Sequence, residues 1–152
     1  MQLSEADRRL LRALQEDSTR SLKDLAAAAG MSSSTLWRRI QEFEAEGLIR
    51  KRVTLLDPEK AGLEVCVLLN VNISNQDRDA REAFERFVAK HDEILQCFAV
   101  TGSHDYTLVV RTRSVAAYER FLMDELLAHP AVASSETHLV LRQPKNATAL
   151  PV

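Results

Sequence analysis

The chain has 152 residues, enough for one medium domain or two small ones, and its 45% hydrophobic and 28% charged residues are ordinary for a globular protein. This composition excludes a disordered chain, and no apolar run approaches the roughly 20 residues needed to cross a bilayer. The net charge of −2 does not by itself indicate a nucleic-acid partner, although residues 1–57 carry a net charge of +1 and residues 58–152 carry −3.

The start of the chain is polar and acidic, without the basic and apolar regions of a signal peptide, so we expect a cytoplasmic protein. Cys66 and Cys97 lie in apolar runs without CxxC spacing, and we interpret them as buried, reduced thiols; a redox role is the alternative. The four histidines lack HxH or HxxxH ligand spacing, so the sequence predicts no metal site.

Three short helices are predicted at the N-terminus, because apolar residues recur at helical spacing and each run starts at a serine that can cap it. The expected caps are Ser4, Ser21 and Ser32, and Gly30 and Gly47 end the second and third helices. Ala26 allows the second and third helices to cross closely, and Met31 fills the turn between them. This is the pattern of a helix-turn-helix, with residues 32–46 as its recognition helix.

The exposed face of that third helix combines hydroxyl and basic side chains, which suit phosphates and base edges, and the basic run 50–52 follows as a wing or strand. The predicted DNA-binding residues are Ser32, Ser33, Ser34, Thr35, Trp37, Arg38, Arg39, Arg50, Lys51 and Arg52. Two of them have an alternative: Trp37 either packs under the wing or faces the DNA groove, and Arg39 either contacts DNA or serves the fold through an ion pair. The glutamates of this helix are assigned to the solvent side or to ion pairs.

From residue 49 onward the pattern changes to short runs rich in valine, leucine and isoleucine that alternate with two amphipathic helices. A short strand is predicted at residues 49–56, ended by Asp57 and Pro58. Further strands are predicted at residues 64–73, 94–101, 106–112 and 132–141, with helices at 77–91 and 115–128.

From residue 64 the order is therefore βαββαβ, which is typical of a ferredoxin-like domain with a four-stranded antiparallel sheet and two helices on one face. The fold class is α+β, with a winged helix-turn-helix in front of this domain. The other face of the sheet needs a cover, and we expect a second subunit to supply it. The expected domains are a DNA-binding domain (1–48), a hinge strand or linker (49–63), the βαββαβ domain with its oligomerisation face (64–141), to which the family resemblance described next adds effector binding, and a tail (142–152).

From residue 3 to residue 141 the chain resembles the Lrp/AsnC, or feast/famine, family of transcription regulators. The segments that carry the resemblance are DRRLLRALQED at 7–17, GMSSSTLWRRI at 30–40 with EAEGLI at 44–49, LLDP at 55–58, and TGSHDY at 101–106. The chain departs from many members at Ser33, where they carry proline, and at Leu36, where they carry Cys or Val; its operator therefore does not carry over from them.

The resemblance implies dimers through the βαββαβ domain, often octamers, binding of promoter DNA, and an amino acid or related small acid as effector. It places the effector site at Thr101, Gly102, His104, Asp105 and Tyr106, with His138 and Val140 on the last strand. Exposed N–H groups in the glycine turn suit a carboxylate, and Asp105 accepts from an ammonium or fixes the loop. His138 stands where the leucine-responsive member has tyrosine, which argues against leucine itself.

Two other interpretations remain beside this one. The glycine turn is also compatible with a plain hairpin, and an architectural DNA-binding protein without an effector would share the same helix-turn-helix. An enzyme is disfavoured, because the sequence has no nucleophile motif, no catalytically spaced carboxylates and no phosphate-binding glycine loop. No catalytic residue and no cofactor are predicted.

Overall fold

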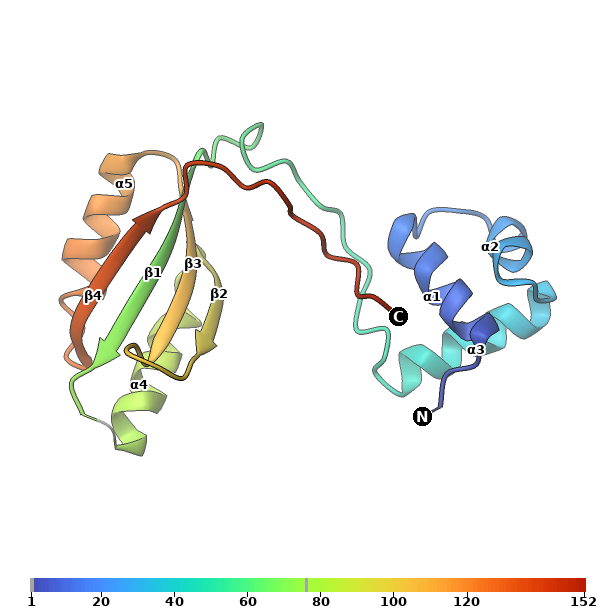
Figure 1. The fold of residues 1–152 in the computed structure, drawn as a ribbon, viewed down its shortest axis with the longest axis horizontal. Helices are drawn as coiled ribbons and strands as arrows, with labels where there is room; N and C mark the ends of the chain where they lie inside the picture. The colour runs from blue at the N-terminus through green and yellow to red at the C-terminus, as the bar shows by residue number, and fades with distance from the viewer. Residues whose placement is uncertain (1, 76) are drawn as a thin grey trace. The chain divides into compact units, whose positions relative to one another are not determined.

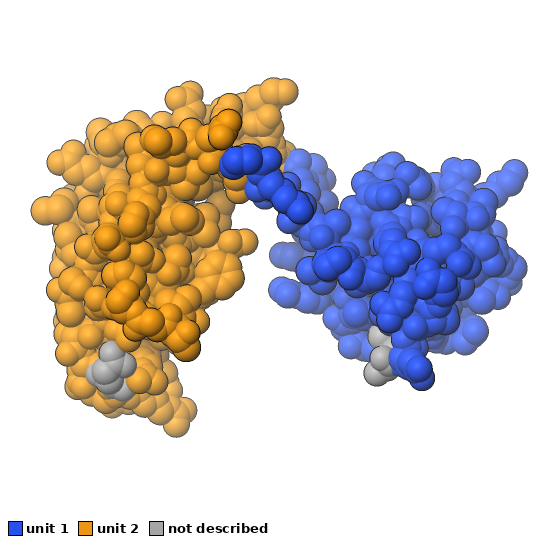
Figure 2. Space-filling model, viewed as in Figure 1, with its two compact units in different colours: residues 1–55, 144–152 blue, residues 56–143 orange. Residues whose placement is uncertain are grey.

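A computed structural model describes residues 2–75 and 77–152 of the chain. The chain forms two compact units, coloured separately in Figure 2. Unit 1 consists of residues 1–55 together with residues 144–152, and unit 2 consists of residues 56–143. Among the described residues, no helix has the length and apolar character needed to cross a membrane.

Unit 1 contains the three predicted helices, α1 (Glu5–Glu16), α2 (Leu22–Ala29) and α3 (Ser33–Ala45). Each begins where the sequence predicts, because a serine hydroxyl accepts the backbone N–H three residues further on: Ser4 from Asp7, Ser21 from Asp24 and Ser32 from Thr35. Gly30 and Gly47 follow α2 and α3 in the left-handed region, with φ of 67° and 73°. The helix-turn-helix is confirmed.

The core of unit 1 is formed by one face of each helix. Leu10 of α1, Ala29 of α2 and Leu36 and Phe43 of α3 are fully buried in it, and Met31 of the turn packs against this cluster. At about 25 cal/mol per Å² of apolar surface removed from water, burying one leucine or phenylalanine contributes roughly 1.5–3 kcal/mol. This packing fixes which face of α3 remains exposed.

The C-terminal tail packs on α1 of the same unit. The backbone N–H of Leu150 donates to Oε1 of Gln15 at 2.6 Å, and Nε2 of Gln15 donates back to the Leu150 carbonyl at 3.1 Å. Nε of Arg12 donates to the Val152 carbonyl oxygen at 2.6 Å, and the Val152 side chain packs against the helical core. The tail and residues 48–55 also border a cavity of about 520 Å³ beside α1.

The predicted strand at residues 49–56 is wrong, because the structure has no strand between α3 and unit 2. A strand exists only where a second strand pairs with it, and no strand of the described chain pairs with this segment. Its apolar side chains are exposed instead, with Val53, Leu55 and Leu56 at 57%, 66% and 75%.

Unit 2 has the predicted βαββαβ order. Its strands are β1 (Val65–Ile73), β2 (Ile94–Ala99), β3 (Tyr106–Thr112) and β4 (Val132–Leu139), and its helical segments are α4 (Arg78–Val88), α5 (Val115–Arg120) and the π-helix η1 (Phe121–Leu126). The strands form an antiparallel sheet in the order β2-β3-β1-β4, and the helices cover one of its faces (Figure 1). The α+β fold class is confirmed.

The core of unit 2 lies between the helices and the sheet. Alternate residues of β1 and β3, such as Leu69, Val71 and Leu108, are buried against Phe84 of α4 and Leu126 of η1. The intervening residues lie on the opposite, open face, where Leu68 and Phe98 are 41% and 50% exposed. Cys66 is buried as predicted, whereas Cys97 is half-buried, and neither is in a disulfide.

Candidate nucleic-acid interface and effector site

The exposed face of α3 begins with three serines and a threonine. The Ser32 hydroxyl is occupied by the cap: it accepts the Thr35 N–H at 3.2 Å and also contacts the Thr35 hydroxyl at 2.9 Å and that of Ser34 at 3.1 Å. Ser33 and Ser34 are exposed at the positive end of the helix, where backbone N–H groups and hydroxyls together suit phosphate oxygens.

Trp37 and Arg38 follow on the same exposed face. Trp37 is 55% exposed, so it does not pack under the segment that follows α3. That it faces the DNA groove stays a prediction. The Arg38 side chain is 65% exposed and pairs with Glu42 one turn further on, at 2.6 Å. An exposed i,i+4 pair of this kind is worth only about 0.3–0.5 kcal/mol, so it leaves the guanidinium available for another partner.

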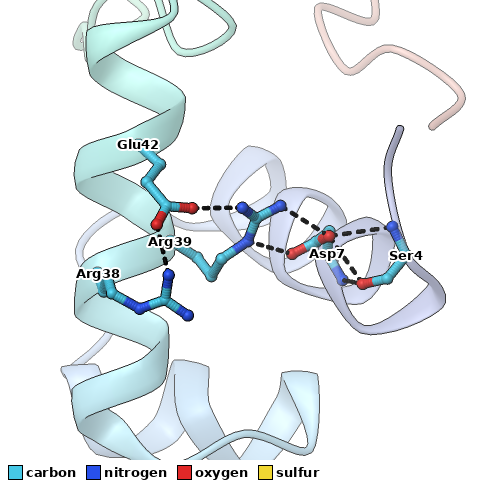
Figure 3. Close-up of polar contacts among 5 residues, drawn as sticks. All are labelled: Ser4, Asp7, Arg38, Arg39 and Glu42. Carbon is cyan, nitrogen blue, oxygen red and sulfur yellow. Dashed lines mark hydrogen bonds and ion pairs between the residues drawn. The ribbon is translucent and has the colours of Figure 1, made fainter. Parts of the chain in front are cut away.

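Arg39 points the other way, into the contact between α3 and α1 (Figure 3). Its Nε and Nη2 donate to the two oxygens of Asp7 at 2.8 and 2.9 Å, it also pairs with Glu42, and its guanidinium carbon lies 4.6 Å from the centre of the Phe43 ring. The Asp7 carboxylate is 6% exposed and also accepts from Ser4. The hydrogen bonds from Arg39 lower the pKa of Asp7 to about 2, and those to Asp7 raise the pKa of Arg39. We therefore assign Arg39 to the fold.

The basic run Arg50, Lys51 and Arg52 is exposed beyond the end of α3. Nη2 of Arg52 donates to Oε1 of Glu44 at 2.9 Å, an ion pair that links this segment back to the helix. Glu42 and Glu44 thus pair with neighbouring arginines, as the sequence suggests for the acidic residues of α3.

The predicted effector loop is the connection between β2 and β3. Gly102 adopts φ +120°, which side-chain-bearing residues rarely do, and Thr101, Gly102 and Ser103 are exposed. The backbone N–H of Val100 donates to the Asp105 carbonyl at 3.0 Å and closes the turn. Within the described chain, no backbone carbonyl accepts from the N–H groups of residues 101–104, so they are available to an anion.

Asp105 joins this turn to β1. Its backbone N–H donates to the Val71 carbonyl at 3.1 Å, and its Oδ2 accepts the Ile73 N–H at 2.8 Å. The carboxylate therefore holds the loop to the end of β1, which matches the second of the two roles that the sequence leaves open for it.

The structure divides the remaining predicted effector residues between the two faces of the sheet. Tyr106 lies on the helix-covered face, where its hydroxyl donates to Glu85 at 2.9 Å, and burial followed by this hydrogen bond raises its pKa to about 12. His138 pairs in register with Leu68 on the open face, and the Val140 N–H donates to the Cys66 carbonyl at 2.9 Å. His104 and His138 are brought together, because both contact Glu136.

Sequence reasoning missed two residues of this open-face group, Glu136 and Asn70. Oε2 of Glu136 lies 3.1 Å from Nε2 of His104 and 3.2 Å from Nε2 of His138, and it accepts from Nδ2 of Asn70 at 3.4 Å. Glu136 could have been found from strand alternation, since it lies two residues from His138 and so on the same face. Asn70 could not, because it reaches this group only through the register between β1 and β4.

A group of three or more His, Cys, Asp or Glu side chains able to hold a metal ion does not occur in residues 2–75 and 77–152. The arrangement as a whole is thus a helix-turn-helix with an exposed hydroxyl and basic face, together with a separate α/β unit whose glycine hairpin offers free N–H groups. The helix-turn-helix places the chain in the class of DNA-binding proteins, with a separate α/β domain attached.

Comparison with known proteins agrees with this class. Residues 3–50 match the model of a winged helix-turn-helix DNA-binding domain, and residues 66–150 match that of the Lrp/AsnC ligand binding domain. The chain is 32% identical over 150 residues to the transcriptional regulator AzlB of Bacillus subtilis, covering 99% of this chain and 96% of that protein.

Solved structures are similar over the same length. A transcriptional regulator of Neisseria meningitidis in complex with L-methionine has a TM-score of 0.95 and 34% identity, covering 99% of this chain and 97% of that one. An AsnC family regulator of Agrobacterium tumefaciens has a TM-score of 0.93 and 34% identity, covering 98% and 97%. The chain belongs to the Lrp/AsnC family and is a DNA-binding transcription regulator rather than an enzyme.

Proposed function

We propose that unit 1 binds double-stranded promoter DNA through the exposed face of α3, with the run 50–52 along the phosphate backbone. The observation that carries this proposal is that two adjacent arginines of α3 have different environments. Arg39 is paired with Asp7 inside the unit, whereas Arg38 is exposed beside Trp37. In this proposal Arg38 donates hydrogen bonds to base edges, and Ser33 and Ser34 contact phosphate. Each base-edge contact contributes about 1–3 kcal/mol to the binding free energy.

Fluorescence anisotropy with labelled promoter fragments tests this assignment. Arg38→Ala should weaken binding to the preferred fragment by about tenfold, whereas Lys51→Ala should weaken binding to all fragments alike and reduce the dependence on salt. Arg20→Ala is the matched control, because Arg20 is a partly exposed arginine of the same unit that pairs with Glu16 outside α3. An unchanged affinity of Arg38→Ala for DNA would contradict the assignment of α3 to the interface.

We further propose that an amino acid binds at the hairpin of residues 101–106 and changes assembly or DNA affinity. The exposed N–H groups around Gly102 receive its carboxylate, Asp105 keeps the loop in place, and His104 and His138 border the space over the open face. The L-methionine complex of the similar Neisseria regulator supports this class of effector. A coupling of this kind typically amounts to about 1–3 kcal/mol.

Calorimetric titration of the twenty amino acids into wild type and Asp105→Ala tests the site. At least one amino acid should bind wild type, and Asp105→Ala should lose this response while it still binds DNA in the absence of effector. Equal binding by both proteins would leave the turn as a plain hairpin. Absence of binding by wild type would favour an architectural protein without effector.

The open face of the sheet is the proposed contact between subunits. It exposes Leu68 and Phe98, and the helices of unit 2 all lie on the other face. We expect a second copy to cover it in a dimer, and the family resemblance extends this to octamers. Light scattering at micromolar concentration measures the mass, and a clean monomer of 17.1 kDa would reject the proposal.

A further inference from the structure

The turn between η1 and β4 uses a histidine side chain as a hydrogen-bond acceptor. The backbone N–H of Ala131 donates to Nδ1 of His129 at 3.2 Å. An imidazole nitrogen accepts a hydrogen bond only while it carries no proton, so this contact requires the neutral ring with its proton on Nε2. Ala131 is 7% exposed, so little water can reach its N–H in place of the imidazole. A proton on Nδ1 would therefore set two donors against each other.

The surroundings of His129 do not favour a charged ring. The centre of its imidazole lies 4.9 Å from that of the Phe87 ring and 6.3 Å from that of Phe84, both on α4, and the Phe87 ring also lies 4.0 Å from that of His91. The other three histidines of the chain each lie beside a glutamate, which can compensate a positive charge, whereas no ion pair of the described residues includes His129. A positive charge on His129 would thus lie beside aromatic rings and a second histidine, without a carboxylate partner.

The protonation equilibrium of His129 follows from these surroundings. Burial, followed by the charge of His91, lowers the pKa of His129 below its ordinary value of 6.5. Of the titratable groups in the described chain, His91 alone contributes electrostatically to this shift, and Glu125 of η1 lies beside His91 at 3.7 Å. Because the folded state disfavours the protonated ring, the stability that neutral His129 gives to the turn is fully present above pH 6.5 and is lost as the pH falls below this value.

The turn is attached to the end of β1. The Val132 N–H donates to the His129 carbonyl at 3.0 Å and closes the turn, and the Ser74 N–H donates to the Ala131 carbonyl at 2.8 Å. Ile73, the residue before Ser74, donates to the carboxylate of Asp105 at 2.8 Å. The turn and the hairpin of residues 101–106 are therefore bound to two adjacent residues at the end of β1, and opening of the turn removes the hydrogen bond of one of them.

We propose that His129 is a pH-sensitive switch: protonation of its imidazole releases the Ala131 N–H and opens the turn of residues 129–132 together with the end of β1. The opening of the turn does not depend on an effector. Its consequence for an effector rests on the function proposed above, because acid conditions weaken the attachment of the strand end that holds Asp105 and the hairpin.

Two measurements on the wild-type full chain test the proposal. Nitrogen-15 NMR of the histidine side chains should show His129 as the Nε2–H tautomer at neutral pH, with a titration midpoint below the ordinary 6.5. Amide hydrogen exchange should show that the protection of residues 74, 131 and 132, corrected for intrinsic rates, falls by at least about threefold between pH 7.5 and pH 5. These amides should also be less protected at pH 5 than Leu108 in the centre of β3, because the opening is local.

Two variants separate the proton from the packing. His129→Asn keeps an acceptor, since an asparagine carbonyl can accept the N–H two residues further on, but it does not titrate. Its protection at the same amides should stay within about twofold between pH 7.5 and pH 5. His129→Phe keeps an aromatic ring against Phe87 but has no acceptor, so these amides should be weakly protected at both pH values.

An Nδ1–H tautomer, or a midpoint at or above 6.5, would refute the switch in the wild type without any variant. The same holds if His129→Asn loses protection in acid as wild type does, or if His129→Phe is protected as well as wild type at pH 7.5. None of these measurements uses an effector. A failure of the switch therefore leaves the proposed effector site untouched, and the calorimetric titration described above judges that site separately.

Discussion

Replacing Arg39 tests the interpretation of the two adjacent arginines of α3. Arg39→Met keeps most of the aliphatic stem but leaves Asp7, which is 6% exposed, without its bidentate partner. Removing one partner of a buried ion pair costs about 3–5 kcal/mol, because the remaining charge is left without compensation. Ser4 continues to donate to Asp7 and reduces this penalty, so we expect a loss of about 2–4 kcal/mol from unit 1.

The pH dependence gives an independent magnitude for the same interaction. The pKa of Asp7 is lowered from 3.8 to about 2, so its contribution is fully present above pH 3.8 and is lost as the pH falls towards 2. A shift of this size corresponds to about 2 kcal/mol. In Arg39→Met the shift should largely disappear, and the difference in stability between the two proteins should therefore narrow below pH 3.8.

Urea unfolding followed by tryptophan fluorescence measures this effect. Trp37 is the single tryptophan and lies on α3, so the signal reports on unit 1 alone. Arg38→Met is the matched control, with an expected loss of at most about 0.5 kcal/mol because its ion pair is exposed. Equal losses in the two variants, or an unchanged difference between wild type and Arg39→Met from pH 5 to pH 2, would refute the reasoning.

Three further outcomes are expected. Gly102→Ala should destabilise the hairpin by about 1–3 kcal/mol, because its φ of +120° strains any side-chain-bearing residue although the space around it is open, and hydrogen exchange at residues 100–105 measures the loss. Deleting residues 148–152 should lower the urea midpoint of the Trp37 signal, since Gln15 loses two hydrogen bonds; an unchanged midpoint would show that the tail contributes nothing. Cys97 should react slowly with iodoacetamide at pH 7.5 in the folded protein, because burial raises its pKa to about 11; rapid labelling seen by mass spectrometry would contradict this.

Features that depend on local sequence were predictable. The starts of the three helices in unit 1 follow from single serines, and the ends of α2 and α3 follow from single glycines. The helix-covered face of the sheet follows from alternation in strands such as β3. The inward direction of Arg39 is also signalled in the sequence, because Arg39 lies three residues after Leu36 and four before Phe43, on the buried stripe of the helix.

Features that depend on pairing between distant segments were not predictable. The strand expected at residues 49–56 has apolar strand-like residues but no partner strand within the described chain. The π-helix η1 was read as part of one continuous helix, because a shift from i+4 to i+5 hydrogen bonds leaves no mark in apolar periodicity. The network around Glu136 requires the β1–β4 register and the reach of His104 across the end of β1.

The docking of the tail on α1 makes unit 2 an insertion within unit 1. The polypeptide leaves unit 1 after residue 55 and returns to it at residue 144, so a second connection joins the units, and hydrogen bonds rather than a covalent bond hold it on α1. The second connection starts directly beyond β4, the strand that carries Glu136 and His138. The chain from Leu139 at the end of β4 to the docked Leu150 is shorter than the segment between α3 and β1, and release of the tail from α1 would leave that longer segment as the single connection between the units.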